Sequence, residues 1–323
     1  MLGASGTIGQ ATVAALVARG HAVVCFVRHR AGIGGALSPA DLARRLPGVE
    51  LRFGDVTDAA SLREEGFRGE RFDALVSCLA SRTGTARDAW AIDHRAHQLA
   101  LAAAKDAGVR QMVLLSALCV QKPKLAFQHA KLAFERELIE SGLAYSIVRP
   151  TAFFKSLSGQ VERVRQGKAF LLFGDGRLTA CKPISDRDLA RYLADCLDDE
   201  SRWNRILPIG GPGAAITPRE QGEMLFALMG KPPKFRSVPP GFLAAIRRVL
   251  AGLGRFSPTL ADKAELAAIG QYYAGESMLV WNAETARYDA DATPSTGSDT
   301  LRDHYARMIR GEIADERGDH AVF

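Results

Sequence analysis

Three glycines, each separated from the next by two residues, stand almost at the start of the chain at Gly3, Gly6 and Gly9. An apolar run over residues 11–18 follows them and predicts a helix. A glycine turn that leads into a helix presents free backbone N–H groups at the positive end of the helix dipole, where a pyrophosphate can bind. The spacing therefore favours a parallel α/β sheet that binds a dinucleotide.

Each glycine has a separate expected task. Gly3 allows the tight turn, Gly6 lets the backbone approach the phosphates, and Gly9 lets the helix pack closely on the sheet. Glycine also serves ordinary tight turns, so the strand-like residues 21–28 beyond Gly20 are needed to favour dinucleotide binding. The positions of the loop expected to line the cofactor are Gly3, Ser5, Gly6, Thr7, Ile8 and Gly9.

The first strand is anomalous. Only Met1 and Leu2 precede Gly3, although a strand of about 5–6 residues normally leads into such a loop. Either the first strand is reduced to a stub, or the natural protein starts upstream and this chain begins at an internal methionine. We favour the second interpretation.

Composition limits the class of protein. The 323 residues, 47% hydrophobic and 24% charged, suit one large α/β domain with a smaller lobe. The net charge of +6 is spread along the chain, which does not indicate nucleic-acid binding; an anionic cofactor or substrate is enough to explain it. The five cysteines are far apart, which predicts free thiols and no protein-held metal. No apolar run approaches the ~20 residues that cross a membrane.

Strand-like and helix-like segments alternate with short connections up to about residue 155. This rhythm predicts a Rossmann-like, doubly wound parallel sheet with helices on both faces and a truncated first strand. We expect an NAD(P)-binding domain over residues 1–155, a substrate-covering α+β lobe interleaved with the sheet over 156–310, and a mobile tail over 311–323. The expected strands are 21–28, 49–53, 72–80, 111–118 and 144–149, and the expected helices include 59–65 (capped by Asp58), 89–105, 124–141, 156–166 and 186–197.

Residues at the carboxyl ends of the strands are candidates to bind the rest of the dinucleotide. Arg28 follows the second strand, where an arginine favours the 2′-phosphate of NADP over the 2′-hydroxyl of NAD. Asp55 and Val56 would flank the adenine, although a simple capping turn is the alternative. Leu79 and Ala80 end the fourth strand, where the phosphates and ribose should run.

Ser116 and Lys131 are the candidate catalytic residues. Their placement, at the end of the fifth strand and on the following helix, resembles the Ser and Tyr-x-x-x-Lys layout of short-chain dehydrogenases/reductases. The tyrosine position holds Phe127, which cannot donate a proton. Lys131 can still hold the nicotinamide ribose, or deliver a proton if burial lowers its pKa. A solvated helix lysine is the alternative.

Four long runs have a more specific resemblance. Together they are similar to the divinyl chlorophyllide a 8-vinyl-reductase family, and the likeness extends over nearly the whole chain. The ending at residues 311–320 resembles that of purple-bacterial members. This family itself lacks the usual catalytic tyrosine, so Phe127 does not imply inactivity. The runs are residues 77–84, 121–135, 145–161 and 173–185.

The resemblance implies an NADPH-dependent oxidoreductase acting on a CH–CH group. Its substrate would be a magnesium tetrapyrrole, a 3,8-divinyl chlorophyllide or protochlorophyllide a, whose 8-vinyl group becomes ethyl in chlorophyll and bacteriochlorophyll biosynthesis. The implied location is the bacterial cytoplasm, with peripheral association with photosynthetic membranes as a further expectation. Oligomeric state stays open.

A large flat pigment needs an apolar slot beside the nicotinamide. Lys155 and Lys182 are candidates to meet its propionate, and the proton donor is left open among Lys131, a tyrosine of the second lobe and water. A non-catalytic NADP-binding redox sensor and an isoflavone-reductase-like alkene reductase are the alternative functions. The candidate aromatic residues, for each of which plain core is the more frequent role, are Trp90, Phe153, Phe154, Phe170, Phe173, Tyr272, Tyr273 and Trp281.

Overall fold

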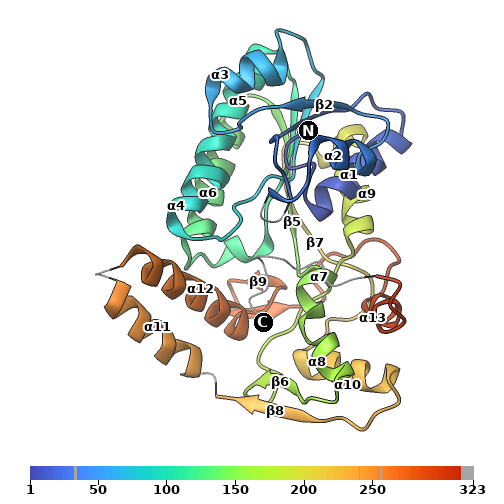
Figure 1. Cartoon of the computed structure of the whole chain (residues 1–323), viewed down its shortest axis with the longest axis vertical. Helices are drawn as coiled ribbons and strands as arrows, with labels where there is room; N and C mark the ends of the chain where they lie inside the picture. Colours follow the sequence, from blue (N-terminus) through green and yellow to red (C-terminus); the bar gives the residue numbers. More distant parts are fainter. Residues whose placement is uncertain (33–34, 240, 255–256, 314–323) are drawn as a thin grey trace.

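A parallel sheet forms the upper part of the molecule and a smaller lobe the lower part, in a computed structural model that describes residues 1–32, 35–239, 241–254 and 257–313 (Figure 1). All strand pairs of the main sheet are parallel, which confirms the predicted doubly wound class. Its strands are β1 (Val24–Val27), β2 (Glu50–Phe53), β3 (Ala74–Ser77), β4 (Gln111–Leu115), β5 (Ala144–Pro150) and β7 (Arg205–Ile209).

The first strand is a stub made by Leu2. This residue forms parallel bridges to Phe26 of β1 and to Ser77 of β3, and so joins the β1–β2 pair to the four strands β3-β4-β5-β7. Its N–H donates to Val76 and its carbonyl accepts from Cys78, at 2.9 and 3.0 Å. The strand order reverses at Leu2, so the loop that follows it opens at the switch point where α/β sheets bind their ligands.

Helices cover both faces of the sheet, each above its own apolar core (Figure 1). On one face α1 (Thr7–Ala18) packs beside α9 (Asp186–Asp198), with α2 (Pro39–Arg45) nearby. On the other face lie α5 (His97–Asp106) and α6 (Ala126–Glu140). Small and branched apolar side chains fill both layers, as expected for strands that are buried on two sides.

Two of the expected helices contain π-helical turns. The helix after Asp58 begins as α3 (Ala59–Ser61) and continues as η2 (Leu62–Phe67), and the Asp58 carboxylate caps it as predicted. The long helix expected over 89–105 is α4 (Ala86–Ala89), then η3 (Trp90–Ala96), then α5. A π turn widens the helix and often marks a functional position, and η3 contains Asp93.

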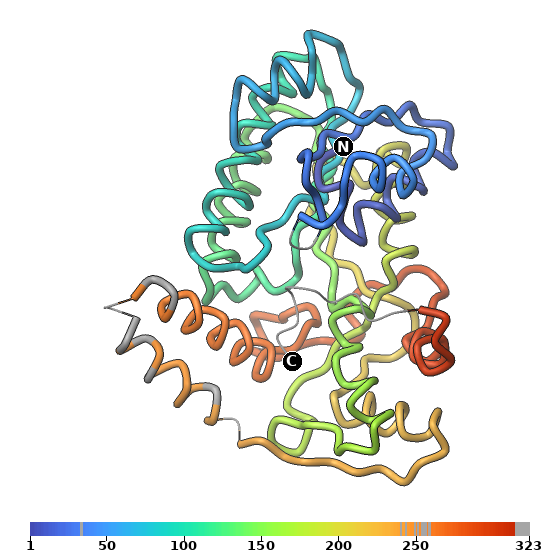
Figure 2. Tube along the Cα trace, viewed as in Figure 1, coloured from blue at the N-terminus to red at the C-terminus, as the bar shows by residue number. Residues whose placement is uncertain are grey.

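The lower lobe has its own core (Figure 2). Its small parallel sheet pairs β6 (Phe170–Phe173) with β8 (Phe235–Val238), and β9 (Val280–Asn282) with β10 (Arg287–Asp289) forms an antiparallel hairpin. The elongated pair α11 (Gly241–Gly254) and α12 (Pro258–Gly275) extends to one side (Figure 2). Further helices after β5 are α7 (Phe154–Leu157), η5 (Ser158–Gln160), α8 (Val161–Arg165), η6 (Glu200–Arg202), α10 (Pro218–Leu228) and α13 (Leu301–Ile309).

Several expectations for the second half were wrong in detail. The single helix predicted over 156–166 is broken into α7, η5 and α8. The helix α13 and the strand β8 were not anticipated. The elements α9 and β7 follow residue 155 in the chain and pack on the main sheet. Most of the expected tail, residues 314–323, lies outside the described residues.

Buried polar contacts join the lobe to the segment that follows β4, which includes η4 (Leu118–Gln121). The Tyr272 hydroxyl donates to the carbonyl of Cys119 at 2.8 Å. Nearby, Glu276 accepts hydrogen bonds from Lys122 at 2.8 Å and also from Lys124 and Tyr288. Burial opposes ionisation of Glu276, but these three bonds outweigh it and lower the pKa of its carboxyl to about 2.

No helix within the described residues is long and apolar enough to span a membrane. The five cysteines are all free, as predicted.

Candidate cofactor and catalytic site

The glycine loop, residues 3–9, has no room for side chains at two of its three glycines. A Cβ on Gly3, which has a φ of +72°, would lie 2.5 Å from the carbonyl carbon of Cys78. A Cβ on Gly9 would lie 2.0 Å from the carbonyl oxygen of Gly3. The loop therefore packs backbone against backbone between α1 and the end of β3.

Gly6 differs from the other two glycines. A Cβ on Gly6 would lie 3.5 Å from the Gly3 carbonyl oxygen, an ordinary contact, and the residue is exposed. Gly6 is also the N-cap of α1, with no side chain available to cap the helix. Open space and uncapped N–H groups at one point fit the pyrophosphate of a dinucleotide.

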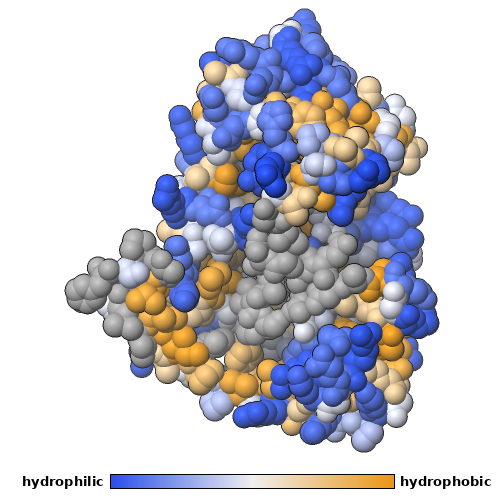
Figure 3. Space-filling view, in the orientation of Figure 1, coloured by the Kyte–Doolittle hydropathy of each residue, from blue (hydrophilic) through white to orange (hydrophobic). Residues whose placement is uncertain are grey.

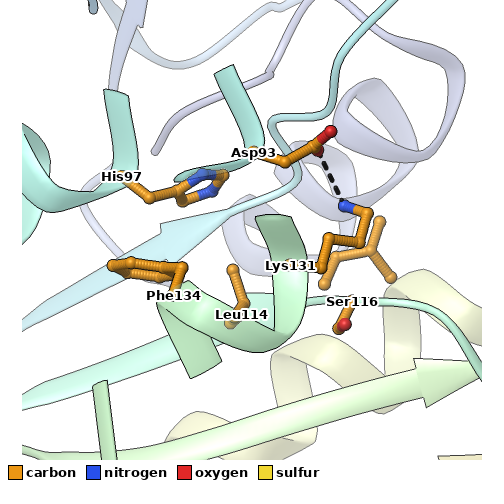
Figure 4. A pocket seen from close by; sticks show the side chains of 7 residues that line it. Asp93, His97, Leu114, Ser116, Lys131 and Phe134 are labelled. Carbon is orange, nitrogen blue, oxygen red and sulfur yellow. Dashed lines mark ion pairs between the residues drawn. The ribbon is translucent and has the colours of Figure 1, made fainter. Parts of the chain in front are cut away.

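Lys131 and Asp93 form a buried ion pair at the carboxyl end of the sheet (Figure 4). The Lys131 Nζ lies 2.9 Å from Asp93 Oδ1, with the lysine side chain 12% exposed and the aspartate 0%. The same oxygen accepts the Ser81 N–H at 3.1 Å, while Oδ2 has no partner among the described residues. The pair thus holds the ammonium in place and leaves Oδ2 of Asp93 buried without a hydrogen-bond partner in the described part of the chain.

Asp93 and His97 were missed by the sequence analysis. Asp93 lies 38 positions before Lys131 and on a different helix, so no local spacing links them. The stretch around Asp93 also contains Asp88, His94 and Arg95, so the residue type alone gave no signal. The small pocket that they share with Lys131, called here the lysine pocket, is lined by Asp93, His97, Leu114, Leu115, Ser116, Lys131 and Phe134 (Figure 4).

His97 is a buried, neutral part of this pocket. Burial lowers the pKa of its imidazole to about 4, and the nearby Lys131 ammonium acts in the same direction. Its Nδ1 lies 3.0 Å from the Ile92 carbonyl and its Nε2 lies 2.9 Å from the Ser77 hydroxyl. A neutral ring satisfies both contacts by donating from Nδ1 and accepting at Nε2. His97 therefore supports the end of β3.

Ser116 lies in the lysine pocket, but its hydroxyl donates to the buried carboxylate of Glu135. Arg149 pairs with that carboxylate from β5. This bond directs the hydroxyl toward Glu135. The catalytic role of Ser116 therefore stays a prediction. Phe127 lies one turn before Lys131 on α6, so its position matches the expected layout.

The predicted adenosine-side residues all lie at the ends of β1, β2 and β3. Arg28 is exposed and has no hydrogen bond or ion pair with another described residue. The Asp55 carboxylate accepts the N–H and hydroxyl of Thr57, as expected for the alternative of a capping turn. Arg82, which we did not predict as a site residue, follows β3 and donates a hydrogen bond to the carbonyl of Gly32, which follows β1.

The carboxyl ends of β1, β2 and β3, the glycine loop and the lysine pocket thus lie along one edge of the sheet. Within the described part of the chain, no group of three or more His, Cys, Asp or Glu side chains could hold a metal ion.

Comparison with known proteins agrees with this arrangement. Residues 3–200 match the NAD(P)H-binding family. The divinyl chlorophyllide a 8-vinyl-reductase of Cucumis sativus is 49% identical over 100% of this chain and 79% of its own length, and that of Oryza sativa subsp. indica is 50% identical over 99% and 81%. The chain belongs to the divinyl chlorophyllide a 8-vinyl-reductase family.

Solved structures confirm the fold. An NADPH-dependent quinone oxidoreductase of Escherichia coli, complexed with NADPH, superposes with a TM-score of 0.65 at 20% identity. The superposition covers 95% of this chain and 98% of that one. At this identity the likeness shows the architecture alone.

Several of the aromatic residues proposed for a pigment slot do not lie at the lysine pocket or the glycine loop. Phe154, Phe170 and Tyr272 are buried in apolar cores, which agrees with the alternative that such aromatic residues are plain core. Trp90 lines a separate surface groove with His129, Leu132 and Arg136. The other four, Phe153, Phe173, Tyr273 and Trp281, are partly exposed.

The two lysines proposed to meet the propionate have different surroundings. The Lys182 ammonium donates to the carbonyl of Thr293 at 2.9 Å. The Lys155 ammonium donates to the Thr7 hydroxyl in the glycine loop, also at 2.9 Å.

Substitution of the glycines by alanine should have different outcomes at different positions. Gly9→Ala should destabilise the fold by about 2–3 kcal/mol, because the new Cβ collides with backbone. Gly6→Ala should change stability by less than about 1 kcal/mol yet weaken NADPH binding about tenfold or more, because its methyl group occupies the phosphate side. Urea unfolding and a fluorescence titration with NADPH measure the two effects. Equal loss of stability in both variants would contradict this division of roles.

Removal of the lysine ammonium should impair turnover. We expect Lys131→Ala to lower kcat about tenfold or more, with His129→Ala, an exposed position on the same helix, as the matched control. Because Lys131→Ala also leaves Asp93 buried without its partner, it should lose about 3–5 kcal/mol of stability. The double variant Asp93→Asn with Lys131→Met should recover much of that stability and remain slow. A double variant with normal turnover would remove the pair from the mechanism.

Proposed function

We propose that this chain uses NADPH to reduce the 8-vinyl group of 3,8-divinyl chlorophyllide or protochlorophyllide a to an ethyl group. The observation that supports the proposal most strongly is the near-50% identity to plant reductases of that name across the whole chain, lower lobe included. A likeness confined to the NAD(P)H-binding residues would support the cofactor alone. We place this activity in a bacterial cytoplasm, consistent with the purple-bacterial resemblance of the chain's ending.

The cofactor-binding residues follow from the geometry of the sheet edge. The glycine loop would hold the pyrophosphate through its free N–H groups, with Ser5, Thr7 and Ile8 beside it. Arg28, exposed and unpaired among the described residues, would meet the 2′-phosphate. Bound NADPH supplies the hydride. The residues left to line the adenine and the ribose are Asp55, Val56, Leu79, Ala80 and Lys131.

The chain must also supply or admit a proton, because conversion of vinyl to ethyl adds one hydride and one proton. The conjugated macrocycle can delocalise the negative charge that develops in between. Lys131 is the group that we assign to this step, because Asp93 orients its ammonium and Phe127 has no proton to give. Tyr273, which is partly exposed, and water are the alternative proton donors. Turnover that persists in Lys131→Ala would favour one of them.

The activity is tested by mixing purified protein, NADPH and divinyl chlorophyllide. Loss of the conjugated 8-vinyl group should move the Soret absorption band to shorter wavelength, with one NADPH oxidised per pigment. If NADPH binds and the band does not move, the protein is a nicotinamide-binding sensor, for which Phe127 would be equally suitable. Reduction of other conjugated alkenes in preference to the pigment would favour an isoflavone-reductase-like activity.

We also propose peripheral membrane association through the region of β8 and α11. Residues 224–261 contain six Lys and Arg residues and no Asp or Glu. Phe242 at the start of α11 is 53% exposed, and Arg247 and Arg248 on that helix are exposed as well. Hydrophobic residues gather beside α11 and α12 on the face in Figure 3. An apolar, basic helix suits the surface of a membrane with anionic lipids.

Vesicle sedimentation tests this association. The parent should bind vesicles that contain phosphatidylglycerol and release them at high salt. Arg247→Glu with Arg248→Glu should bind about thirtyfold more weakly or worse, since each of the two basic residues contributes about 1 kcal/mol near such a surface. Arg110→Glu, at an exposed position directly before β4, is the control. Equal binding by parent and double variant would contradict the proposal.

A further inference from the structure

Lys155 reaches from the lower lobe to the glycine loop. It belongs to α7, the first helix after β5, and its Nζ donates to the Thr7 Oγ1 at 2.9 Å. Thr7 is the first residue of α1, directly after the open glycine Gly6. This contact joins two residues 148 positions apart and connects the lobe with the part of the sheet that would receive the phosphates.

The charges around this contact are unbalanced. Within the described residues Lys155 forms no ion pair, so no carboxylate compensates its ammonium. The neighbouring N-terminus of α1 also has partial positive charge, and its N-cap Gly6 offers no side-chain acceptor. A cation beside the positive end of a helix is unfavourable by itself, whereas an anion bound between them would be attracted by both.

The backbone around Lys155 is held in place. Phe154, the preceding residue, is 4% exposed, and its N–H donates to the Ile184 carbonyl at 3.2 Å. Its own carbonyl accepts the Ser158 hydroxyl at 2.8 Å. Because the helix is anchored on both sides, the ammonium stays within reach of the glycine loop.

We propose that Lys155 binds the pyrophosphate of the cofactor, and that it thereby links the lower lobe to the nucleotide-binding sheet when NADPH is bound. This role of Lys155 rests on the proposed use of NADPH and adds a residue to the cofactor site. It also replaces the expected role of Lys155 at the substrate's propionate, because an ammonium that donates to Thr7 lies at the phosphate side of the site.

Calorimetric titration separates the two roles. NADPH contains the pyrophosphate, while adenosine 2′-monophosphate has the 2′-phosphate and no 5′-phosphate. Lys155→Met should raise the Kd for NADPH about tenfold or more and leave the Kd for adenosine 2′-monophosphate unchanged. Lys155→Arg should recover most of the affinity. Lys182→Met, whose ammonium donates to a backbone carbonyl in the same lobe, is the matched control and should bind NADPH normally.

Hydrogen exchange reports the link between the two parts. NADPH should slow amide exchange in α7 of the parent and leave α7 of Lys155→Met unaffected. The proposal is overturned if Lys155→Met binds NADPH like the parent while its KM for the pigment rises, which would return Lys155 to the propionate. Equal weakening of both nucleotides, without rescue by Lys155→Arg, would also overturn it. Failure of the parent itself to bind NADPH would instead reject the proposed function.

Discussion

Backbone packs directly on backbone in the glycine loop, and this close approach positions every other part of the site. Gly3 lies against the peptide that joins Cys78 to Leu79, and Gly9 lies against Gly3 itself. These contacts bring the start of α1 to the point where Leu2 pairs with both neighbouring strands. The open side of Gly6 therefore faces outward at the switch point of the sheet, which is where a dinucleotide binds.

Two buried ion pairs, on the face of the sheet opposite α1, fix the positions of the charged side chains near that point. Asp93 on η3 forms an ion pair with Lys131 on α6. The carboxylate of Glu135, which is paired with Arg149, accepts a hydrogen bond from the hydroxyl of Ser116. Each of these buried charges has a partner, as its removal from water requires. In consequence Lys131 is the ammonium that projects into the lysine pocket, while Ser116 is directed into the interior.

Two of the contacts that fasten the lower lobe to this edge involve the segments after β4 and β5. Glu276 and Tyr272 bind the segment after β4, and Lys155 reaches the glycine loop from the segment after β5. Both attachment segments follow directly from strands of the main sheet. A substrate held by the lobe would therefore lie next to whatever the sheet edge binds. For a reductase of a large pigment, this arrangement would place the macrocycle beside the nicotinamide.

The amino-acid sequence alone was sufficient to predict the doubly wound class, the glycine loop and the position of Lys131 with Phe127 one turn before it. These features depend on local spacing and on hydrophobic runs, which can be read in one dimension. Three further features emerged only from the folded chain: Asp93 is the partner of Lys131, Phe154 and Tyr272 belong to the core, and Lys155 donates to Thr7 of the glycine loop. Each of these is a contact between segments far apart in the chain, set by how helices pack on the sheet and by the need to pair buried charge, and no spacing in the sequence encodes it.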